Sequence, residues 1–312
     1  FNQGRYLEET IRSVLSQEGD FYIDYIVMDG GSDDESKDII KKYDSLIKDN
    51  TETITINDTR FYRYGGNNGQ NIHGTGCHGI SFRWKSEKDN GQVHALKKGF
   101  AMAVGNIYCW LNSDDYYLDH TVLKRVHGYF EAEPGTELLF GDGEFVSASG
   151  DVIGHHYVKQ INLNELLFLD YHILQPASFF RSRIYREEHL DESYTCAFDA
   201  DFFIRHIATG LPYKKVDDRF AAFRFYDENK TNKLREIRFR EAMQIAGNHF
   251  AHCSVQVPPA KRFYFPVSRL YRRAEMKRNM GLSTRNRVRS KWFHIKRRIA
   301  YRLITGRWKR EE

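Results

Sequence analysis

The stretch that decides the fold is residues 107–115, IYCWLNSDD, in which an apolar run ends in an acidic turn. The run predicts a buried strand, and the turn places Asp114 and Asp115 at the carboxyl end of that strand. Ligands of open α/β sheets bind beyond the carboxyl ends of the strands, so adjacent carboxylates at this point favour a cation site. Asp and Asn also cap helices, and for this turn alone the capping interpretation stays open.

A second acidic turn, at residues 26–33 (IVMDGGSD), also follows an apolar strand. Two such turns in one half of the chain indicate a site for a nucleoside diphosphate and its cation. The chain has neither a G-x-G-x-x-G loop after a strand nor a G-x-x-x-x-G-K-[ST] loop to cradle phosphates. Neutralisation of a diphosphate would therefore fall to Asp114 and Asp115 with Mg²⁺ or Mn²⁺, which take one or two carboxylates plus phosphate oxygens.

Apolar residues at helical spacing alternate with short apolar runs around these two turns. The helices that we expect cover residues 6–17, 34–46, 93–104 and 117–132, and the strands cover residues 24–28, 80–84 and 107–111. That alternation predicts an α/β fold with a Rossmann-like, mostly parallel central sheet flanked by helices. Residues 50–79, rich in Gly, Asn and Thr, predict an inserted loop with room for a hairpin around residues 60–62.

The formal net charge of +5 conceals a strongly basic C-terminal segment. Residues 261–312 hold 18 Lys and Arg against three acidic residues, so the rest of the chain is net negative. This asymmetry favours an anionic surface as a partner. We therefore expect a domain at residues 1–257 and a basic helical tail at residues 258–312.

Residues 285–310 of the tail combine apolar and basic side chains at helical spacing. Val288, Trp292 and Ile295 share one face, and Lys and Arg surround them. Such a helix can lie in the plane of an anionic membrane, where each basic residue contributes about 1 kcal/mol. The alternative is a helix packed on the domain with its charges solvated.

Cysteine usage and hydropathy bear on the cellular compartment. The four cysteines form no C-x-x-C pair, which predicts reduced thiols in the cytosol. No run approaches the roughly 20 apolar residues that span a bilayer. We expect a cytoplasmic protein, peripheral on the cytoplasmic face of the inner membrane if the tail binds there. The chain starts at Phe1, which predicts a fragment or a processed chain.

Seven segments in a fixed order carry a resemblance to a known family. They are residues 1–14 (FNQGRYLEETIRSV), 29–33 (DGGSD), 86–92 (SEKDNGQ), 111–115 (LNSDD), 175–181 (QPASFFR), 198–202 (FDADF) and 223–226 (FRFY). With these segments the chain resembles the family 2 glycosyltransferases of the GT-A fold, in the bacterial branch that builds cell-surface polysaccharides. The resemblance runs from residue 1 to about residue 250, and the family's first strand would precede residue 1.

The resemblance implies a role for each of several residues. The implied nucleotide-binding residues are Asn2, Gly4, Asp29, Gly30, Ser32, Asp89, Gly91 and Gln92. The implied metal ligands are Asp114 and Asp115. The residues implied to contact the donor sugar or the acceptor are Asn112, Asp115, Gln175 and Arg181. The implied catalytic base is Asp199, with Asp201 as the second candidate.

Three positions depart from the family pattern. Asn112 stands where many relatives have Asp, so metal binding should rest on Asp114. Phe198 precedes Asp199 where relatives often have Glu. Tyr226 replaces a His that relatives often place beside the diphosphate, which puts that contact in doubt.

The activity that the resemblance implies is the inverting transfer of a sugar from a nucleotide-diphosphate sugar, with UDP as the default nucleotide of the family. The acceptor would be a hydroxyl of a growing cell-surface glycan or of a lipid-linked acceptor. Mn²⁺ or Mg²⁺ is the implied cofactor, and Asp199 would take the proton of the hydroxyl.

Two other interpretations stay open at this point. A nucleotidyltransferase-like enzyme would need basic, Gly-rich triphosphate contacts near the N-terminus, and none is visible there. A non-catalytic protein could bind an anionic surface or nucleic acid through the tail. We expect no nucleic acid partner, because the acidic body would repel phosphate and Trp292 sits on an apolar helical face.

Overall fold

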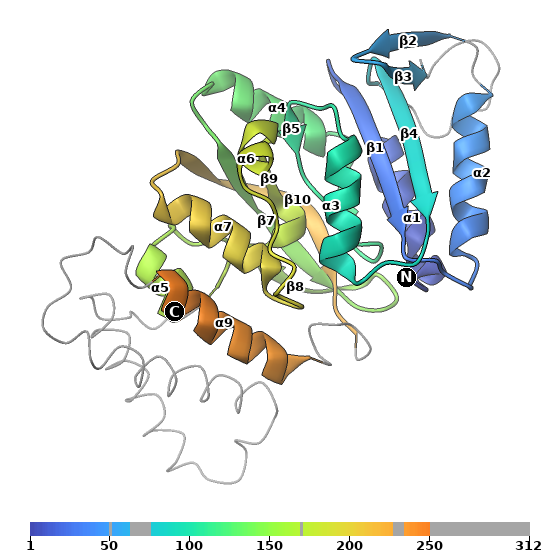
Figure 1. Ribbon diagram of the computed structural model, residues 1–312. Helices are drawn as coiled ribbons and strands as arrows, with labels where there is room; N and C mark the ends of the chain where they lie inside the picture. The colour runs from blue at the N-terminus through green and yellow to red at the C-terminus, as the bar shows by residue number, and fades with distance from the viewer. Residues whose placement is uncertain (50–51, 63–75, 169–170, 227–233, 250–312) are drawn as a thin grey trace, which may run out of the picture.

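Two β-sheets with helices packed on them form the scaffold of the protein (Figure 1). The computed structural model describes residues 1–49, 52–62, 76–168, 171–226 and 234–249. The first sheet has the order β1-β4-β3-β2, with strands β1 (Tyr22–Asp29), β4 (Gly79–Ser86), β3 (Thr59–Tyr62) and β2 (Thr53–Ile56). The second has the order β5-β9-β7-β10-β6, with strands β5 (Ile107–Tyr108), β9 (Ser178–Arg181), β7 (Leu138–Val146), β10 (Tyr213–Arg224) and β6 (Tyr116–Tyr117). Strand β8 (Val152–His156) pairs with β7.

The expected mostly parallel sheet is wrong. Among the described strands only β1 with β4 and β7 with β10 run parallel, and the six other pairs are antiparallel. For β7 and β8 the reason is that the chain after residue 146 returns through a tight turn, closed by the bond from Ser147 N to Asp151 O (2.8 Å), and not through a helix. Two strands joined by a tight turn must be antiparallel, whereas parallel strands need a long crossover.

The helices follow the sequence pattern closely in the first half of the chain. Helices α1 (Gly4–Leu15), α2 (Ser36–Lys48) and α3 (Gln92–Met102) lie within a few residues of the expected ranges. Helix α4 (Val122–Ala132) begins later than expected, because Tyr116 and Tyr117 pair with β10 as strand β6. The remaining described helices are α5 (Leu163–Phe168), η1 (Gln175–Ala177), α6 (Ser182–Glu187), α7 (Phe198–Ala208) and α9 (Arg235–His249).

The hairpin expected within residues 50–79 is confirmed. Strands β2 and β3 pair antiparallel, and the turn between them uses Asn57 and Asp58 with positive φ of 46° and 60°. Asn and Asp tolerate this left-handed conformation better than other non-Gly residues. Strand β3 then adds the hairpin to the edge of β4. Residues 63–75 lie outside the described part of the chain.

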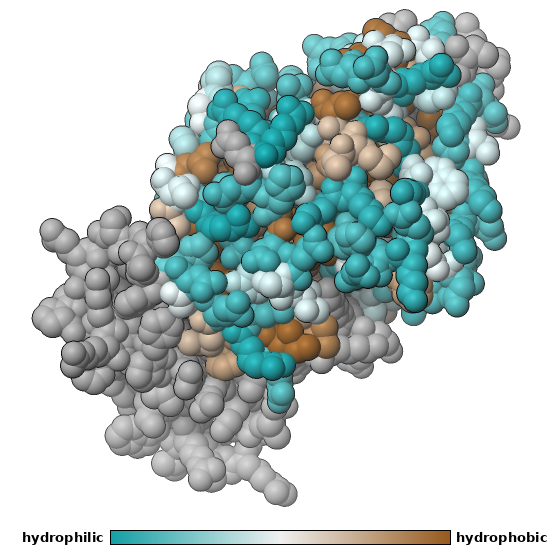
Figure 2. Space-filling view, viewed as in Figure 1, coloured by the Kyte–Doolittle hydropathy of each residue, from teal (hydrophilic) through white to brown (hydrophobic). Residues whose placement is uncertain are grey.

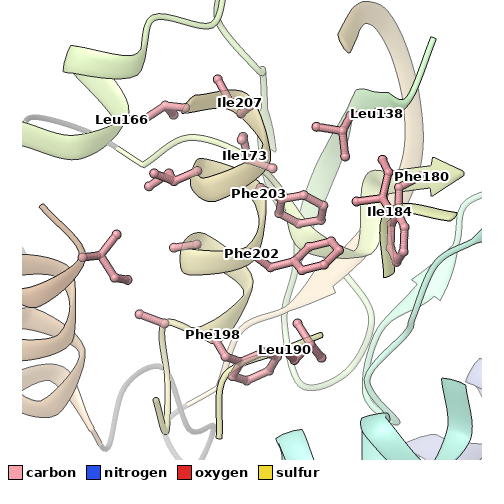
Figure 3. Close-up of a cluster of buried hydrophobic side chains, with 14 of the residues drawn as sticks. Leu138, Leu166, Ile173, Phe180, Ile184, Leu190, Phe198, Phe202, Phe203 and Ile207 are labelled. Atoms are coloured by element: carbon pink, nitrogen blue, oxygen red, sulfur yellow. The ribbon is translucent and has the colours of Figure 1, made fainter. Parts of the chain in front are cut away.

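An aromatic core fixes α7 against the second sheet (Figure 3). Phe202 and Phe203 of α7 are fully buried, and the ring of Phe203 stacks on Trp110 with centroids 5.7 Å apart. Phe180 of β9 packs on Phe202 at 5.1 Å. Each buried Phe side chain contributes about 1.5–3 kcal/mol. This cluster therefore holds the N-terminus of α7 near the residue that precedes the acidic turn.

The surface seen in Figure 2 is mostly hydrophilic, with small separate hydrophobic patches. No helix within the described ranges is long and apolar enough to cross a membrane.

The tail expected at residues 258–312, with its amphipathic helix at 285–310, lies outside the described residues, which end at His249. The domain boundary at residue 257 therefore stays a prediction.

Candidate active site

The first acidic turn forms a buried hydrogen-bonded cluster at the carboxyl end of β1. Asp29 is 7% exposed and accepts hydrogen bonds from Ser32 N (3.0 Å), Ser32 Oγ (2.5 Å) and Ser86 Oγ (2.5 Å). Ser32 Oγ in turn accepts a bond from Asn2 N at 2.8 Å. Between them, Gly31 has φ +82°, and a Cβ there would lie 3.3 Å from Lys88 N. A glycine therefore suits both the conformation and the space.

Hydrogen bonding lowers the pKa of Asp29. Burial alone would raise this pKa, but the bonds from Ser32 and Ser86 favour the carboxylate and outweigh it. A carboxyl whose pKa is lowered in the folded state adds stability above its unfolded pKa of about 3.9. That contribution is lost as the pH falls through the lowered value.

We expect Ser32→Ala to lower the free energy of unfolding by about 1–3 kcal/mol at neutral pH, since it leaves Asn2 N without this acceptor and Asp29 without this donor. The part that depends on the Asp29 charge should disappear in acid. Urea unfolding at pH 7 and at a pH below the lowered pKa of Asp29 measures both values. The exposed Ser193→Ala serves as the control, and an equal loss at both pH values would contradict the role of the carboxylate.

The segment that precedes α3 lies against the Asp29 cluster. A Cβ on Gly30 would lie 2.8 Å from Asp89 Oδ2, so a larger residue here would push the Asp89 carboxylate aside. Asp89 Oδ1 accepts a bond from Gly91 N at 2.8 Å, and Gly91 itself has φ +116° at the start of α3. Gly4 N donates to Asp34 Oδ2 at 2.8 Å. The structure thus brings expected nucleotide-binding residues from the N-terminal segment, the first acidic turn and the segment before α3 to one place.

Side-chain amides link α3 to the second acidic turn. Gln92 Nε2 donates to Asn112 Oδ1 at 2.5 Å, and Asn112 Nδ2 donates to Asp115 Oδ2 at 2.9 Å and to Gln175 Oε1 at 3.3 Å. Gln175 Nε2 donates to the carbonyl of Trp110 at 2.6 Å. The amide of Asn112 can both accept and donate, which an Asp at this position could not do. Asn112 therefore acts as the junction of the two halves of the site.

Asp115 is committed to bonds within the protein. It is 1% exposed, and its two oxygens accept bonds from Asn112 Nδ2 and from Arg224 N (3.1 Å). Burial, and then the neighbouring charge of Asp114, raise the pKa of Asp115 well above its usual range. This arrangement fits a structural carboxyl group better than a metal ligand.

Asp114 is better suited to a cation. Its Oδ2 accepts one side-chain hydrogen bond, from Tyr226 Oη at 2.8 Å, and Tyr226 Oη also lies 3.4 Å from Gln3 Oε1. Burial raises the pKa of Asp114, while the bond from Tyr226 and the charge of Arg224 oppose that rise. No group of three or more His, Cys, Asp and Glu side chains in the described ranges could hold a metal ion. One carboxylate fits Mg²⁺ or Mn²⁺ only where phosphate oxygens complete the coordination.

Arg224, the last residue of β10, contacts the acidic turn with its buried side chain. Its side chain is 2% exposed, Nε donates to the carbonyl of Asp114 at 3.1 Å, and NH1 donates to the carbonyls of Ser147 and Ala148 at 3.1 and 3.2 Å. NH2 forms an ion pair with Glu9 of α1. The guanidinium also lies over the rings of Tyr6 and Tyr116, with 4.6 and 5.5 Å to the centroids. The sequence signal for this role is an arginine within the short apolar run at residues 221–225 (AAFRF).

The two candidate bases lie in the first turn of α7 in different environments. Asp201 is buried and pairs with Arg205 Nε (3.0 Å) and His249 Nε2 (3.6 Å), so it is held in structural contacts. Asp199 is half-buried and follows Phe198, whose ring centroid lies 6.4 Å from that of Trp110. Asp199 therefore sits where α7 meets the residue before the acidic turn.

Arg181 lies away from this network, at the opposite end of β9 from Gln175. Its NH2 donates to the carbonyl of Phe130 at 3.0 Å and its Nε to the carbonyl of Thr136 at 3.4 Å. The guanidinium also lies 4.8 Å from the centroid of the Phe130 ring. These contacts secure the end of α4, so we leave Arg181 out of the site.

Comparison with known proteins identifies the neighbours of this sequence. The sequence model of Glycosyl transferase family 2 matches residues 1–68. The chain is 22% identical over 237 residues to an uncharacterized glycosyltransferase of Methanocaldococcus jannaschii, a match that covers 75% of this chain and 70% of that protein.

Comparison with solved structures identifies neighbours of the fold. Residues 1–349 of Staphylococcus aureus TarS, in complex with UDP-GlcNAc, match with a TM-score of 0.57 and 15% identity, over 97% of this chain and 79% of that chain. The mannosyltransferase PcManGT of Pyrobaculum calidifontis, in complex with GDP-Man and Mn²⁺, matches with a TM-score of 0.52 and 11% identity, over 98% and 85%. At these identities the similarity establishes the fold, which is the α/β fold of GT-A transferases.

Proposed function

We propose that this chain, which belongs to glycosyl transferase family 2, moves a sugar from a nucleotide-diphosphate sugar to an acceptor hydroxyl with inversion at the anomeric carbon. The observation that carries the proposal is the bond from Gln92 to Asn112, which joins the Asp29 cluster to the acidic turn. A nucleotide at the first turn would thereby place its diphosphate at the second. We propose UDP as the nucleotide and a cell-surface glycan or lipid-linked hydroxyl as the acceptor.

Each part of the site has a defined task in this proposal. Polar groups of Asn2, Asp29 and Asp89 bind the nucleoside, and Asn112 and Gln175 face the sugar. Asp114 supplies the carboxylate for Mn²⁺ or Mg²⁺, which when bound would offset the charge of the leaving diphosphate. Tyr226 orients that carboxylate, in place of the His that relatives often carry.

The bond changes follow from these positions. The acceptor oxygen forms a bond to the anomeric carbon, and the carbon–oxygen bond to the diphosphate breaks with its electron pair. The proton of the acceptor hydroxyl passes to a carboxylate of Asp199. General base catalysis of this kind contributes about 10²–10⁴-fold to the rate.

We expect Asp114→Asn to abolish metal-dependent nucleotide binding. Calorimetric titration of UDP into the protein, with Mn²⁺ and then with EDTA, measures the effect, and GDP tests the choice of nucleotide. The variant should bind UDP with Mn²⁺ no better than the unmodified protein does with EDTA, because the amide brings no negative charge to the cation. The exposed Asp151→Asn is the matched control.

Three results would count against parts of this proposal. Binding of GDP alone would keep the enzyme class and change the donor. Binding of UDP that is equally strong with EDTA would remove the metal. No binding of either nucleotide by a folded protein would overturn the proposed site as a whole.

A further inference from the structure

A buried carboxylate from α9 holds the segment that leads into α7. Glu241 is 7% exposed, and its Oε1 accepts a hydrogen bond from Thr195 N (2.6 Å). Its Oε2 accepts bonds from Cys196 N and Ala197 N (2.8 Å each). Ala197 is the N-cap of α7 and has no side-chain cap of its own. From 44 residues away, Glu241 therefore accepts the N–H of the N-cap residue, the bond that the N3 Glu of a capping box would make, and it also accepts the N–H groups of the two residues before it.

The same segment is held from its other side by the residues around the acidic turn. Phe198 packs on Trp110, and the carbonyl of Trp110 accepts the bond from Gln175 Nε2. Figure 3 shows Phe198 at the beginning of α7, among the buried hydrophobic side chains of the aromatic core. Asp199 is the next residue in the chain, so it directly follows both anchored positions.

Further contacts show that α9 packs specifically on this region. Asn248 Nδ2 donates to Tyr194 Oη at 3.2 Å, and His249 Nε2 lies 3.6 Å from Asp201 Oδ1. Figure 1 shows α9 beside α7. Bonds from one helix thus reach both the segment before α7 and its first turn.

We propose that Glu241 is a positioning residue for sugar transfer, which fixes the segment 194–197 and thereby the carboxylate of Asp199 relative to the acceptor hydroxyl. This inference rests on the proposed function. A carboxylate that moves by about 1 Å from its productive position can lose about 10²-fold in rate, even where the substituted residue lies far from the reacting atoms. We expect Glu241 not to affect the position of the Asp29 cluster, because that cluster lies on another sheet.

The test is a double-mutant cycle of Glu241→Gln with Asp199→Asn. Turnover is measured as the release of nucleoside diphosphate from UDP-GlcNAc and from GDP-mannose, first with water as the acceptor. Nucleotide binding is measured by calorimetry of UDP or GDP with Mn²⁺. We expect Glu241→Gln to lower kcat by about 10–100-fold while KM for the donor and nucleotide binding stay within about twofold. In the Asp199→Asn background Glu241→Gln should cause no further loss, because the two residues act as one unit.

The controls separate positioning from general damage. Glu236→Gln changes an exposed glutamate on the same helix and should leave kcat unchanged. Thermal unfolding of each variant shows whether it folds. If Glu241→Gln does not fold, Glu241→Asp takes its place in the cycle, since it keeps the charge and shortens the side chain by one methylene.

The outcomes distinguish this inference from the proposed function. Equal losses from Glu241→Gln in both backgrounds, or a parallel loss of nucleotide binding, would overturn the positioning role and leave the proposed function standing. Full turnover by Asp199→Asn would overturn the inference together with the choice of base. Absence of nucleotide binding and turnover in the unmodified protein would overturn the proposed function itself.

Discussion

Asp199→Asn is expected to lower the turnover number for sugar transfer by about 10²–10⁴-fold while nucleotide binding stays unchanged. The amide cannot take the proton of the acceptor hydroxyl, whereas the Asp29 cluster and Asp114 keep their hydrogen bonds. Steady-state kinetics with the donor identified by titration measures kcat, and calorimetry with the same nucleotide measures binding.

The effect of Asp201→Asn on turnover, compared with that of Asp199→Asn, decides which of the two carboxylates is the base. Asp201 pairs with Arg205 and His249, so its replacement should lower the unfolding temperature more than the turnover number. If Asp201→Asn abolished transfer with binding intact and Asp199→Asn did not, the role of the base would pass to Asp201. If neither variant changed kcat, neither residue would be the base.

Arg224→Met is expected to lower the free energy of unfolding by about 3–5 kcal/mol. The substitution removes a buried cation and leaves the carboxylate of Glu9 and the carbonyls of Asp114, Ser147 and Ala148 without their donor. Methionine replaces the apolar stem of arginine but not its guanidinium, so the loss combines the missing polar contacts with the space left at the buried end of the side chain. Urea unfolding followed by tryptophan fluorescence measures the difference.

Two further variants test whether the buried charge is the cause. Arg219→Met removes an arginine of the same strand that is 50% exposed and pairs with Glu144, and it should cost at most about 1 kcal/mol. Glu9→Gln combined with Arg224→Met should be less destabilised than the sum of the two single variants, because no unpaired charge remains. Equal losses for Arg219→Met and Arg224→Met would contradict the assignment.

Local sequence patterns predict the elements of the first half well, since a single periodic stretch determines each of them. The apolar face of α1 and the run in β1 are visible without knowledge of their partners. The direction of a strand is a different kind of property, because it depends on how the chain returns. The turn at residues 147–151 reverses β7 into β8, which makes these two strands antiparallel.

The resemblance implies roles for ligand-binding residues, and those roles stay predictions. The structure pairs Asp29 with Ser32 and Asn112 with Gln175 through hydrogen bonds. Glu241 went unnoticed because its partners lie 44 to 46 residues away and are backbone amides, which leave no mark in the sequence. The resemblance implies a ligand role for Arg181 through the segment 175–181, yet the carbonyls of Phe130 and Thr136 take up its donors.

The contact between Arg224 and the acidic turn also bears on how the protein is made. Arg224 follows Asp115 by 109 residues, so the ribosome produces the paired carboxylates long before the cation beneath them. Until β10 emerges, the nascent chain carries both acids without this counter-charge and without the donor that holds Asp115. A chain interrupted before this strand contains both acids but lacks Arg224 and Tyr226, the two side chains that contact Asp114 from the end of β10 and beyond. Synthesis through residue 226 is therefore required before the acidic turn can reach the arrangement seen in the folded protein.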